Sequence, residues 1–222
     1  MDVAKKQNAR GQLNGDVEVD AHGLRSYHIS TRNTAYSKYV TPALQKRKCK
    51  YYLNYKRVLG LRKRGGGKVF IRFLPPHLVP PRSTPPPESA QEVKSSGILR
   101  HAKPGACVVH SDGAQAYPAV IKAAYPRLKH RAVSHKEMEF VKKVARVTLP
   151  SGKKSAASTG TQAIDSTWKT LEQCVPKEVH TKSGHTENRL LEDYAYSWLF
   201  RINHRCHDGF QVLGEFAAKK RP

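Results

Sequence analysis

The feature that most constrains the fold is a short apolar run that stops abruptly. Residues 107–109, read CVV, are apolar and rich in β-branched side chains, which is typical of a buried strand. The polar residues His-Ser-Asp-Gly follow at 110–113 and have turn chemistry. Asp112 is therefore expected just past the C-terminal end of a buried strand, which is where open α/β sheets bind ligands. A plainer interpretation is that Asp112 caps the next helix.

Charge indicates the class of partner. The 222 residues include 40 Lys and Arg against 17 Asp and Glu, a formal charge of +23. A globule so basic repels itself unless it meets a polyanion, and nucleic acid fits best because phosphate contacts release counterions. No apolar stretch reaches 18 residues and no long basic amphipathic helix is evident, so we expect no membrane partner.

Targeting and redox signals are sparse. The first residues lack the apolar middle of a secretion signal, and the four cysteines form no Cys-x-x-Cys pair, which excludes a zinc ribbon. We expect a reduced intracellular protein: nuclear in a eukaryote, where the KKRP ending could act as a signal, and cytoplasmic in a bacterium.

Periodicity predicts an α/β or α+β domain with a sheet and flanking helices, and we expect α/β. Alternation over 16–30 predicts a first strand that ends near Asp20, or a hairpin; apolar runs at 58–61 and 69–74 around RKRGGGK predict a second hairpin. Extended structure is also expected between 132 and 141. Helices are expected at 88–102, 117–125, 162–175 and 187–204.

The predicted organisation is one core with additions. Residues 1–15 form an arm, 16–213 the core and 214–222 a basic tail. Within the core, 31–56 form a basic insertion, and 75–87, with seven prolines, form an extended surface linker. The low-complexity segment 150–161 is expected to be mobile.

Three acidic residues stand out by position: Asp20, Asp112 and Asp165, the last in the first turns of an amphipathic helix. Carboxylates from two strand ends and one helix can converge on a pair of divalent cations, and Mg²⁺ prefers such oxygen ligands. Two such ions stabilise the attacking and leaving oxygens of a phosphoryl transfer. The hypothesis is an enzyme that cuts and joins DNA or RNA with Mg²⁺ (or Mn²⁺).

The motifs around these residues resemble a known family. VEVDAHGLRSY around Asp20, VVHSDGAQAY around Asp112, and GTQAIDSTWKTLE followed by WLFRINHR are similar to the catalytic core of bacterial insertion-sequence DDE transposases of the ISXO-two-like group. The resemblance spans roughly residues 15–213. It implies an RNase H-like fold, a mixed sheet flanked by helices, and metal-dependent cleavage and transfer of DNA strands, acting on element ends and target.

Carried over by position, the resemblance makes Asp20, Asp112 and Asp165 the catalytic and metal-binding residues. It places His135 near the site and has Trp168 pack the helix. It matches Arg201 and Asn203 to a late Phe-Arg-x-Asn signature, with a structural or a DNA-contacting role.

The chain departs from the family at several positions. Asp165 stands where Glu is usual, and Glu172 where a cation is often found, with Lys169 one turn earlier. Gly-Thr-Gln at 160–162 replaces His-Thr-Asn, and the chain begins almost at the core, without a zinc-ribbon or helical DNA-binding region. A truncated or decayed copy that only binds nucleic acid is therefore the main alternative.

The residues expected to bind DNA mostly lie in a basic stretch with interleaved aromatic rings, which suits backbone contacts and base stacking. They are Lys46, Arg47, Lys48, Lys50, Tyr51, Tyr52, Lys56, Arg62, Lys63 and Arg64, together with His135, Lys169 and Arg201. The competing interpretation of this stretch is a solvated basic loop.

Other interpretations stay open at this point. His204, Cys206 and His207 could hold a structural zinc, although no second ligand pair is evident. A basic RNA-binding protein unrelated to transposases would be favoured if the three aspartates lay far apart. A homo-oligomer is possible.

Overall fold

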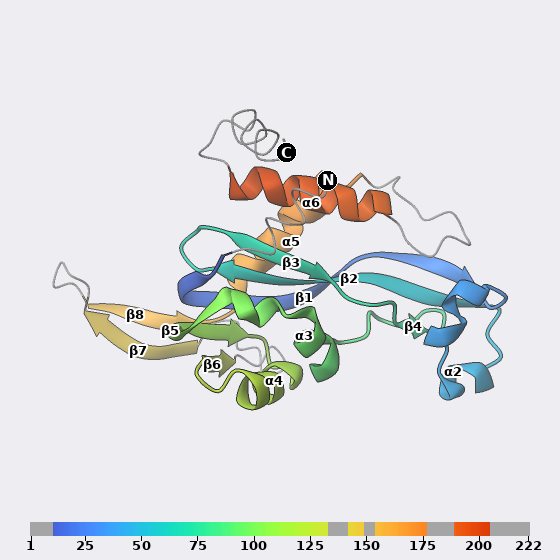
Figure 1. Ribbon diagram of the computed structural model, residues 1–222, viewed down its shortest axis with the longest axis horizontal. Coiled ribbons are helices and arrows are strands. Elements are labelled where there is room, and N and C mark those ends of the chain that lie inside the picture. The colour runs from blue at the N-terminus through green and yellow to red at the C-terminus, as the bar shows by residue number, and fades with distance from the viewer. Residues whose placement is uncertain (1–10, 133–141, 149–153, 177–188, 205–222) are drawn as a thin grey trace, which may run out of the picture.

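The protein is an α/β structure with a mixed six-stranded sheet flanked by helices (Figure 1). This computed structural model describes residues 11–132, 142–148, 154–176 and 189–204. The strands are β1 (Leu13–Ser30), β2 (Tyr51–Lys63), β3 (Val69–Phe73), β4 (Leu78–Val79), β5 (Ala102–Ser111), β6 (Lys129–Ala132), β7 (Lys142–Thr148) and β8 (Lys154–Thr159). The helices are η1 (Thr34–Tyr39), α2 (Pro42–Lys46), α3 (Ala90–Ser96), η2 (Ile98–His101), α4 (Ala116–Ala124), α5 (Gln162–Cys174) and α6 (Arg189–Asn203).

The main sheet has the order β3-β2-β1-β5-β6, with the short β4 beside β2. β1, β2 and β3 form an antiparallel meander, whereas β5 pairs parallel to β1 and β6 parallel to β5. β1 is therefore the central strand. In its register, Asp20 lies opposite Gly60 of β2.

β1 is much longer than the sequence predicts. The expectation of a strand that ends near Asp20 is wrong, because β1 continues to Ser30 and pairs with β2 along almost its whole length. The ladder shifts register between Gly23 and Arg25 and ends at the pair Ser30 and Tyr51. Residues 51–56, expected within the basic insertion, are thus the first part of β2.

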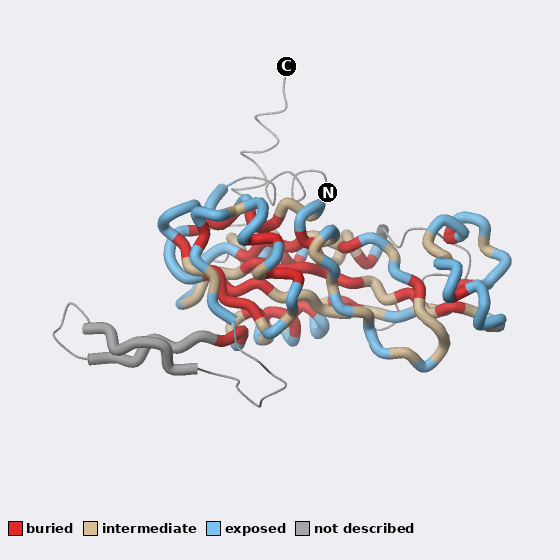
Figure 2. Tube along the Cα trace, turned by 90° about the horizontal axis from the view of Figure 1, so that it is seen from below, coloured by how far each residue is buried: buried red, intermediate tan, exposed pale blue. Residues whose placement is uncertain are grey.

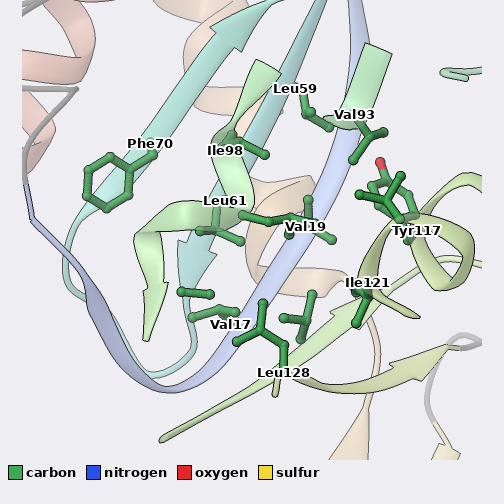
Figure 3. Close-up of a cluster of buried hydrophobic side chains, with 14 of the residues drawn as sticks. Val17, Val19, Leu59, Leu61, Phe70, Val93, Ile98, Tyr117, Ile121 and Leu128 are labelled. Atoms are coloured by element: carbon green, nitrogen blue, oxygen red, sulfur yellow. The ribbon is translucent and has the colours of Figure 1, made fainter. Parts of the chain in front are cut away.

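The sheet buries apolar side chains on both faces, as alternation along a strand requires. On one face, Val17, Val19, Leu59 and Leu61 belong to a cluster with α3, η2 and α4 (Figure 3). On the other face, Val58, Val69 and Ile71 pack with α5 and α6. Figure 2 shows the buried residues concentrated along the central strands.

A third, smaller cluster lies at the far end of the β1–β2 ladder, next to η1 and α2 (Figure 1). It contains Ile29, Tyr36, Leu44, Tyr52 and Leu78. We call this region, residues 25–56 with β4, the arm; from here on the word does not refer to residues 1–15. It projects beyond the part of the sheet that the larger helices cover.

Three of the four main helices follow the sequence predictions closely. Both ends of α4, α5 and α6 lie within two residues of the expected bounds. The helix expected at 88–102 is shorter. α3 ends at Gly97, whose φ of 64° is the left-handed conformation that stops a helix, and η2 follows. Of the segment 150–161, expected to be mobile, residues 150–153 lie outside the described residues, whereas Lys154–Thr159 forms β8, paired with β7.

Candidate active site

A pocket of about 250 Å³ opens where β1, β5 and the end of the proline-rich segment meet. Asp20 and Asp112 both line it, so the structure brings together the first two predicted aspartates. The other lining residues are Ala21, His22, Gly23, Arg57, Pro85, Pro86, Pro87, Glu88 and Ala114.

Asp20 is held in an unusual electrostatic environment. Burial raises the pKa of Asp20 to about 7, from 3.8. A hydrogen bond from Trp168 Nε1 to Asp20 Oδ2, 2.8 Å long, opposes the rise, while the charges of Asp112, Asp165 and Glu88 add to it. Functional sites often contain a carboxylate whose pKa is raised by burial and by repulsion from neighbouring carboxylates.

Gly60 makes the contact between Asp20 and Trp168 possible. A Cβ at Gly60 would lie 2.3 Å from Trp168 Cη2 and 2.7 Å from Cζ2. Gly60 lies opposite Asp20 in the ladder, and only a residue without a side chain at this position lets the indole lie over β2. The 3% exposed Trp168 therefore packs α5 on the sheet, as expected, and orients the carboxylate as well.

Asp112 is fixed by a tight turn. Its Oδ1 accepts a hydrogen bond from the backbone N–H of Ala114 at 3.1 Å, and Ser111 Oγ donates to its carbonyl oxygen at 2.9 Å. The N-cap of α4 is Gln115, so the plainer interpretation of Asp112 as a helix cap is wrong. The turn leaves Asp112 at the C-terminal edge of β5, on the pocket.

Asp165 lies in the first turn of α5, partly exposed, with Thr161 Oγ1 donating to its Oδ2 at 3.4 Å. It does not line the pocket, but its charge acts on Asp20. Thr161, the N-cap of α5, makes no side-chain capping bond.

Instead, Glu18 of β1 accepts from the N–H of Ile164 at 2.9 Å. This 3% exposed carboxylate also binds Arg64 Nε at 2.7 Å, and thereby fixes the start of α5 against the sheet.

Two arginines predicted to bind DNA are engaged inside the protein. Arg64 also donates to the Gly160 carbonyl. Arg62 Nη1 donates to the Ala163 carbonyl and the Thr167 hydroxyl, both at 2.7 Å. Both side chains thus hold the first turn of α5, which carries Asp165.

The remaining predicted DNA contacts fall into two groups. Lys46, Arg47, Lys48 and Lys50 are exposed on the arm, and Lys169 and Arg201 are exposed on α5 and α6. By contrast, Tyr52 is buried in the arm cluster, Lys56 pairs with Glu192, and Tyr51 stacks on His28 with centroids 4.2 Å apart. Lys63 is half-buried on β2. His135 lies outside the described residues.

Glu172, one of the departures from the family pattern, contacts His22 of β1. His22 Nε2 lies 2.9 Å from Glu172 Oε1, and the His22 ring stacks on Trp168 with a centroid distance of 5.6 Å. Glu172 therefore binds an imidazole that also lines the acidic pocket. The acidic residue on α5 and the histidine on β1 form a pair beside Asp20.

The late signature is at least partly structural. Asn203 Oδ1 accepts from the N–H of Val69 at 2.7 Å, and its Nδ2 donates to the Val69 carbonyl at 2.9 Å. This amide ties the end of α6 to the edge strand β3. Of the possible zinc ligands, His204 packs against Phe200, whereas Cys206 and His207 lie outside the described residues.

The pocket offers carboxylate oxygens as its donors for a metal ion. Among the described residues, no three His, Cys, Asp or Glu side chains are grouped closely enough to hold one ion between them. Asp20 and Asp112 do share the pocket, and Mg²⁺ commonly binds one or two carboxylates while keeping several waters. The donor chemistry therefore fits a hydrated divalent cation.

In the described part of the chain, no helix has the length and apolarity needed to cross a membrane.

Sequence reasoning missed Glu18, Arg57, Glu88 and Tyr117. Glu18 had a signal: it lies two residues before Asp20 in an alternating strand, hence on the same face. Glu88 followed a proline run that looked like a linker, and nothing in the sequence placed it beside Asp20.

Comparisons of the chain with protein-family models, curated proteins and solved structures found no match. The resemblance to DDE transposases therefore depends on the motifs themselves.

Proposed function

We propose that this chain is a DDE transposase-like protein that binds DNA and cleaves and transfers its strands with divalent cations. The observation that carries the proposal is the arrangement of Asp20, Asp112 and Asp165. They come from the central strand, the end of its parallel neighbour and the first turn of a helix on the sheet, and the charges of the latter two act on Asp20.

We propose further that the domain is RNase H-like. The support is the strand order β3-β2-β1-β5-β6, with an antiparallel meander followed by two parallel strands, and helices on both faces. The arm and the proline-rich segment would then be insertions in that core. The arm includes the outer half of β1 and the start of β2, and the proline-rich segment lies between β3 and β5.

Asp20 and Asp112 would hold Mg²⁺ or Mn²⁺, with Asp165 completing the site. The cations would supply charge stabilisation for the attacking and leaving oxygens of the phosphodiester. The chain's own groups orient the carboxylates: the Trp168 N–H aims Asp20, the turn at Ala114 aims Asp112, and Thr161 aims Asp165.

DNA would be bound through the exposed cations of the arm and of α5 and α6. The charge of +23 supplies sequence-independent attraction to a polyphosphate. Because Arg62, Arg64 and Lys56 are engaged within the protein, Lys46, Arg47, Lys48 and Lys50 are the better candidates for phosphate contacts.

A second candidate is a nucleic-acid-binding protein of the same fold without catalysis. Two observations favour it: Asp165 does not line the pocket, and the described residues contain no three-ligand group. A single assay distinguishes the two candidate functions.

The test is nicking of a supercoiled plasmid by the purified protein with Mg²⁺, Mn²⁺ or EDTA. The proposal predicts metal-dependent nicking that Asp112→Asn abolishes, while salt-dependent DNA binding persists. Asp193→Asn on α6 is a control with the same charge change and should nick normally. Binding without nicking in any metal would favour the second candidate, and nicking that survives both Asp20→Asn and Asp112→Asn would overturn the site.

A further inference from the structure

A groove of about 540 Å³ lies between the arm and the start of α6. Its lining comes from η1, from Lys56 of β2, from the end of β3 with the residues that follow it, and from Glu192 of α6. It shares no residue with the acidic pocket around Asp20. Its volume is typical of pockets that bind small molecules or parts of larger ligands.

Aromatic rings form part of the lining, and contacts inside the protein fix two of them. Tyr36 is 1% exposed, and its hydroxyl is hydrogen-bonded to that of Tyr27, which accepts from Asn54 Nδ2 at 2.7 Å. The Phe73 ring meets Tyr196 of α6 edge-on, with centroids 5.9 Å apart. These rings are therefore in place before any ligand binds, which lowers the entropic cost of binding.

Tyr39 is the ring of the groove that a ligand can reach. It is only half-buried, and its centroid lies 6.0 Å from that of Tyr36. The ammonium of the exposed Lys38 lies over this ring, 5.1 Å from the centroid. A cation over an exposed ring is held weakly, so a planar ligand can take its place over Tyr39.

An ion pair supplies polar groups next to the rings. Lys56 Nζ pairs with Glu192 and lies 5.0 Å from the Phe73 centroid. The side chains of this pair are 14% and 22% exposed, so the pair is mostly shielded from water. The groove thus offers a donor and an acceptor beside aromatic faces, and a nucleobase has both a π-face to stack and an edge to hydrogen-bond.

The charge around the groove indicates the class of ligand. Lys38 and Lys56 outnumber Glu192 in the lining, and Lys46 and Arg47 are exposed on the same arm. Sites for single-stranded nucleic acid combine stacking rings with cations that follow the phosphates. Bases inside a duplex already stack on one another, so only an unpaired base can enter.

We propose that this groove binds one unpaired base of a DNA strand, stacked on Tyr39. Lys38 leaves the ring when the base enters and contacts the adjacent phosphate. The inference rests on the proposed function only in taking DNA as the ligand. It requires neither the cation site nor catalysis.

The test measures binding of the full chain in EDTA to a short single strand of DNA and to the blunt duplex of the same sequence, by fluorescence anisotropy. Tyr39→Ala should weaken binding to the single strand about tenfold and leave duplex binding within about twofold, which also shows that the variant is folded. Tyr39→Phe keeps the ring and should bind as the wild type does. Lys38→Ala should have a smaller effect than Tyr39→Ala, and Lys122→Ala on α4 is its control.

A strand without bases isolates the stacking contribution. The wild type should bind an abasic strand of the same length about tenfold more weakly than the normal strand, because the phosphates remain and the rings are lost. Tyr39→Ala should lose most of that difference, which a purely structural role of Tyr39 would leave unchanged.

The outcomes separate the inference from the proposed function. If Tyr39→Ala binds every ligand as the wild type does, the inference fails and the proposed DNA binding stands. Equal weakening for strand and duplex, or an unchanged preference for the normal over the abasic strand, would also overturn stacking on Tyr39. If the wild type binds neither strand nor duplex, the proposed function fails together with the inference.

Discussion

The two halves of the β1–β2 ladder differ in how they are covered. The inner half, around Val19, Asp20 and Gly60, is packed between α5 on one face and the α3–α4 layer on the other. The outer half is covered mainly by the two short helices of the arm, and its turn region carries Lys46, Arg47 and other exposed cations (Figure 1).

Under the proposed function, the same pair of strands would serve two purposes. In the inner half, Glu18, Asp20 and His22 each have a defined partner on α5, as precise positioning of carboxylates requires. In the outer half, cations are free to meet a polyanion, where register matters less than charge. Variants in the inner half should change stability and the site, and variants in the outer half should change DNA affinity alone.

The largest effect is expected for Arg57→Met. Removing this guanidinium leaves the mostly buried Glu92 carboxylate, 13% exposed, without its cation and leaves the carbonyls of Pro75 and Pro87 without their donor. Breaking a buried pair from one side costs about 3–5 kcal/mol, so the free energy of unfolding in urea should fall by that amount. Arg47→Met on the exposed arm is the matched control and should change it by no more than about 0.5 kcal/mol.

The next effect is expected for Gly60→Ala. The added methyl group would overlap the Trp168 ring, and overpacking of this kind costs about 1–3 kcal/mol. Displacement of the indole should also break its hydrogen bond to Asp20, visible as a change in Trp fluorescence. Gly23→Ala in the same ladder adds a Cβ 3.4 Å from Pro85 and should change stability little; equal losses in both variants would contradict the account.

A smaller effect depends on pH. The folded pKa of Asp20, about 7, lies above its unfolded value of 3.8, so the folded state keeps the proton longer. The contribution of Asp20 to stability is full below about pH 4 and is lost as pH rises through 7. In EDTA, Asp20→Asn should match the wild type near pH 4 and exceed it at pH 8 by roughly 2 kcal/mol, after allowance for partial solvent access. Thermal unfolding at both pH values measures this, and a difference independent of pH would argue against the raised pKa.

The smallest effect on stability belongs to the arm. Replacing Lys46, Lys48 and Lys50 together by Ala should leave the unfolding free energy within about 0.5 kcal/mol. The slope of log K against log salt for DNA binding should become shallower by about 0.9 for each phosphate that the variant no longer neutralises. Lys122→Ala on α4 is the control outside the arm. An unchanged slope would remove the arm from the DNA interface.

The sequence predicts the positions of individual helices and strands better than the contacts between them. The Val-rich run before Asp112, the hairpin around the glycine-rich turn and the amphipathic helix with Trp168 were all predictable, because each depends on local periodicity. The length of β1 was not, since its outer half alternates less clearly than the run that ends at Asp20.

The missed parts of the candidate site depend on long-range contacts. Glu88 lines the pocket with Asp20, and Arg57, 31 residues earlier in the chain, holds the Pro87 carbonyl just before it. Arg62 and Arg64 looked like phosphate ligands because a cation in a turn is usually solvated, and only the packed structure shows α5 at that turn. No local pattern encodes such contacts.

In the proposed site, Asp20 is the central residue of one group of carboxylates that binds a divalent cation. The most direct test is a titration of the Asp20 carboxyl carbon by NMR in protein labelled with ¹³C-aspartate, assigned with Asp20→Asn, with and without Mg²⁺. The account predicts titration near pH 7 without the cation and a fall in that apparent pKa when Mg²⁺ is present. Titration near 3.8, or a midpoint that Mg²⁺ does not move, would contradict it.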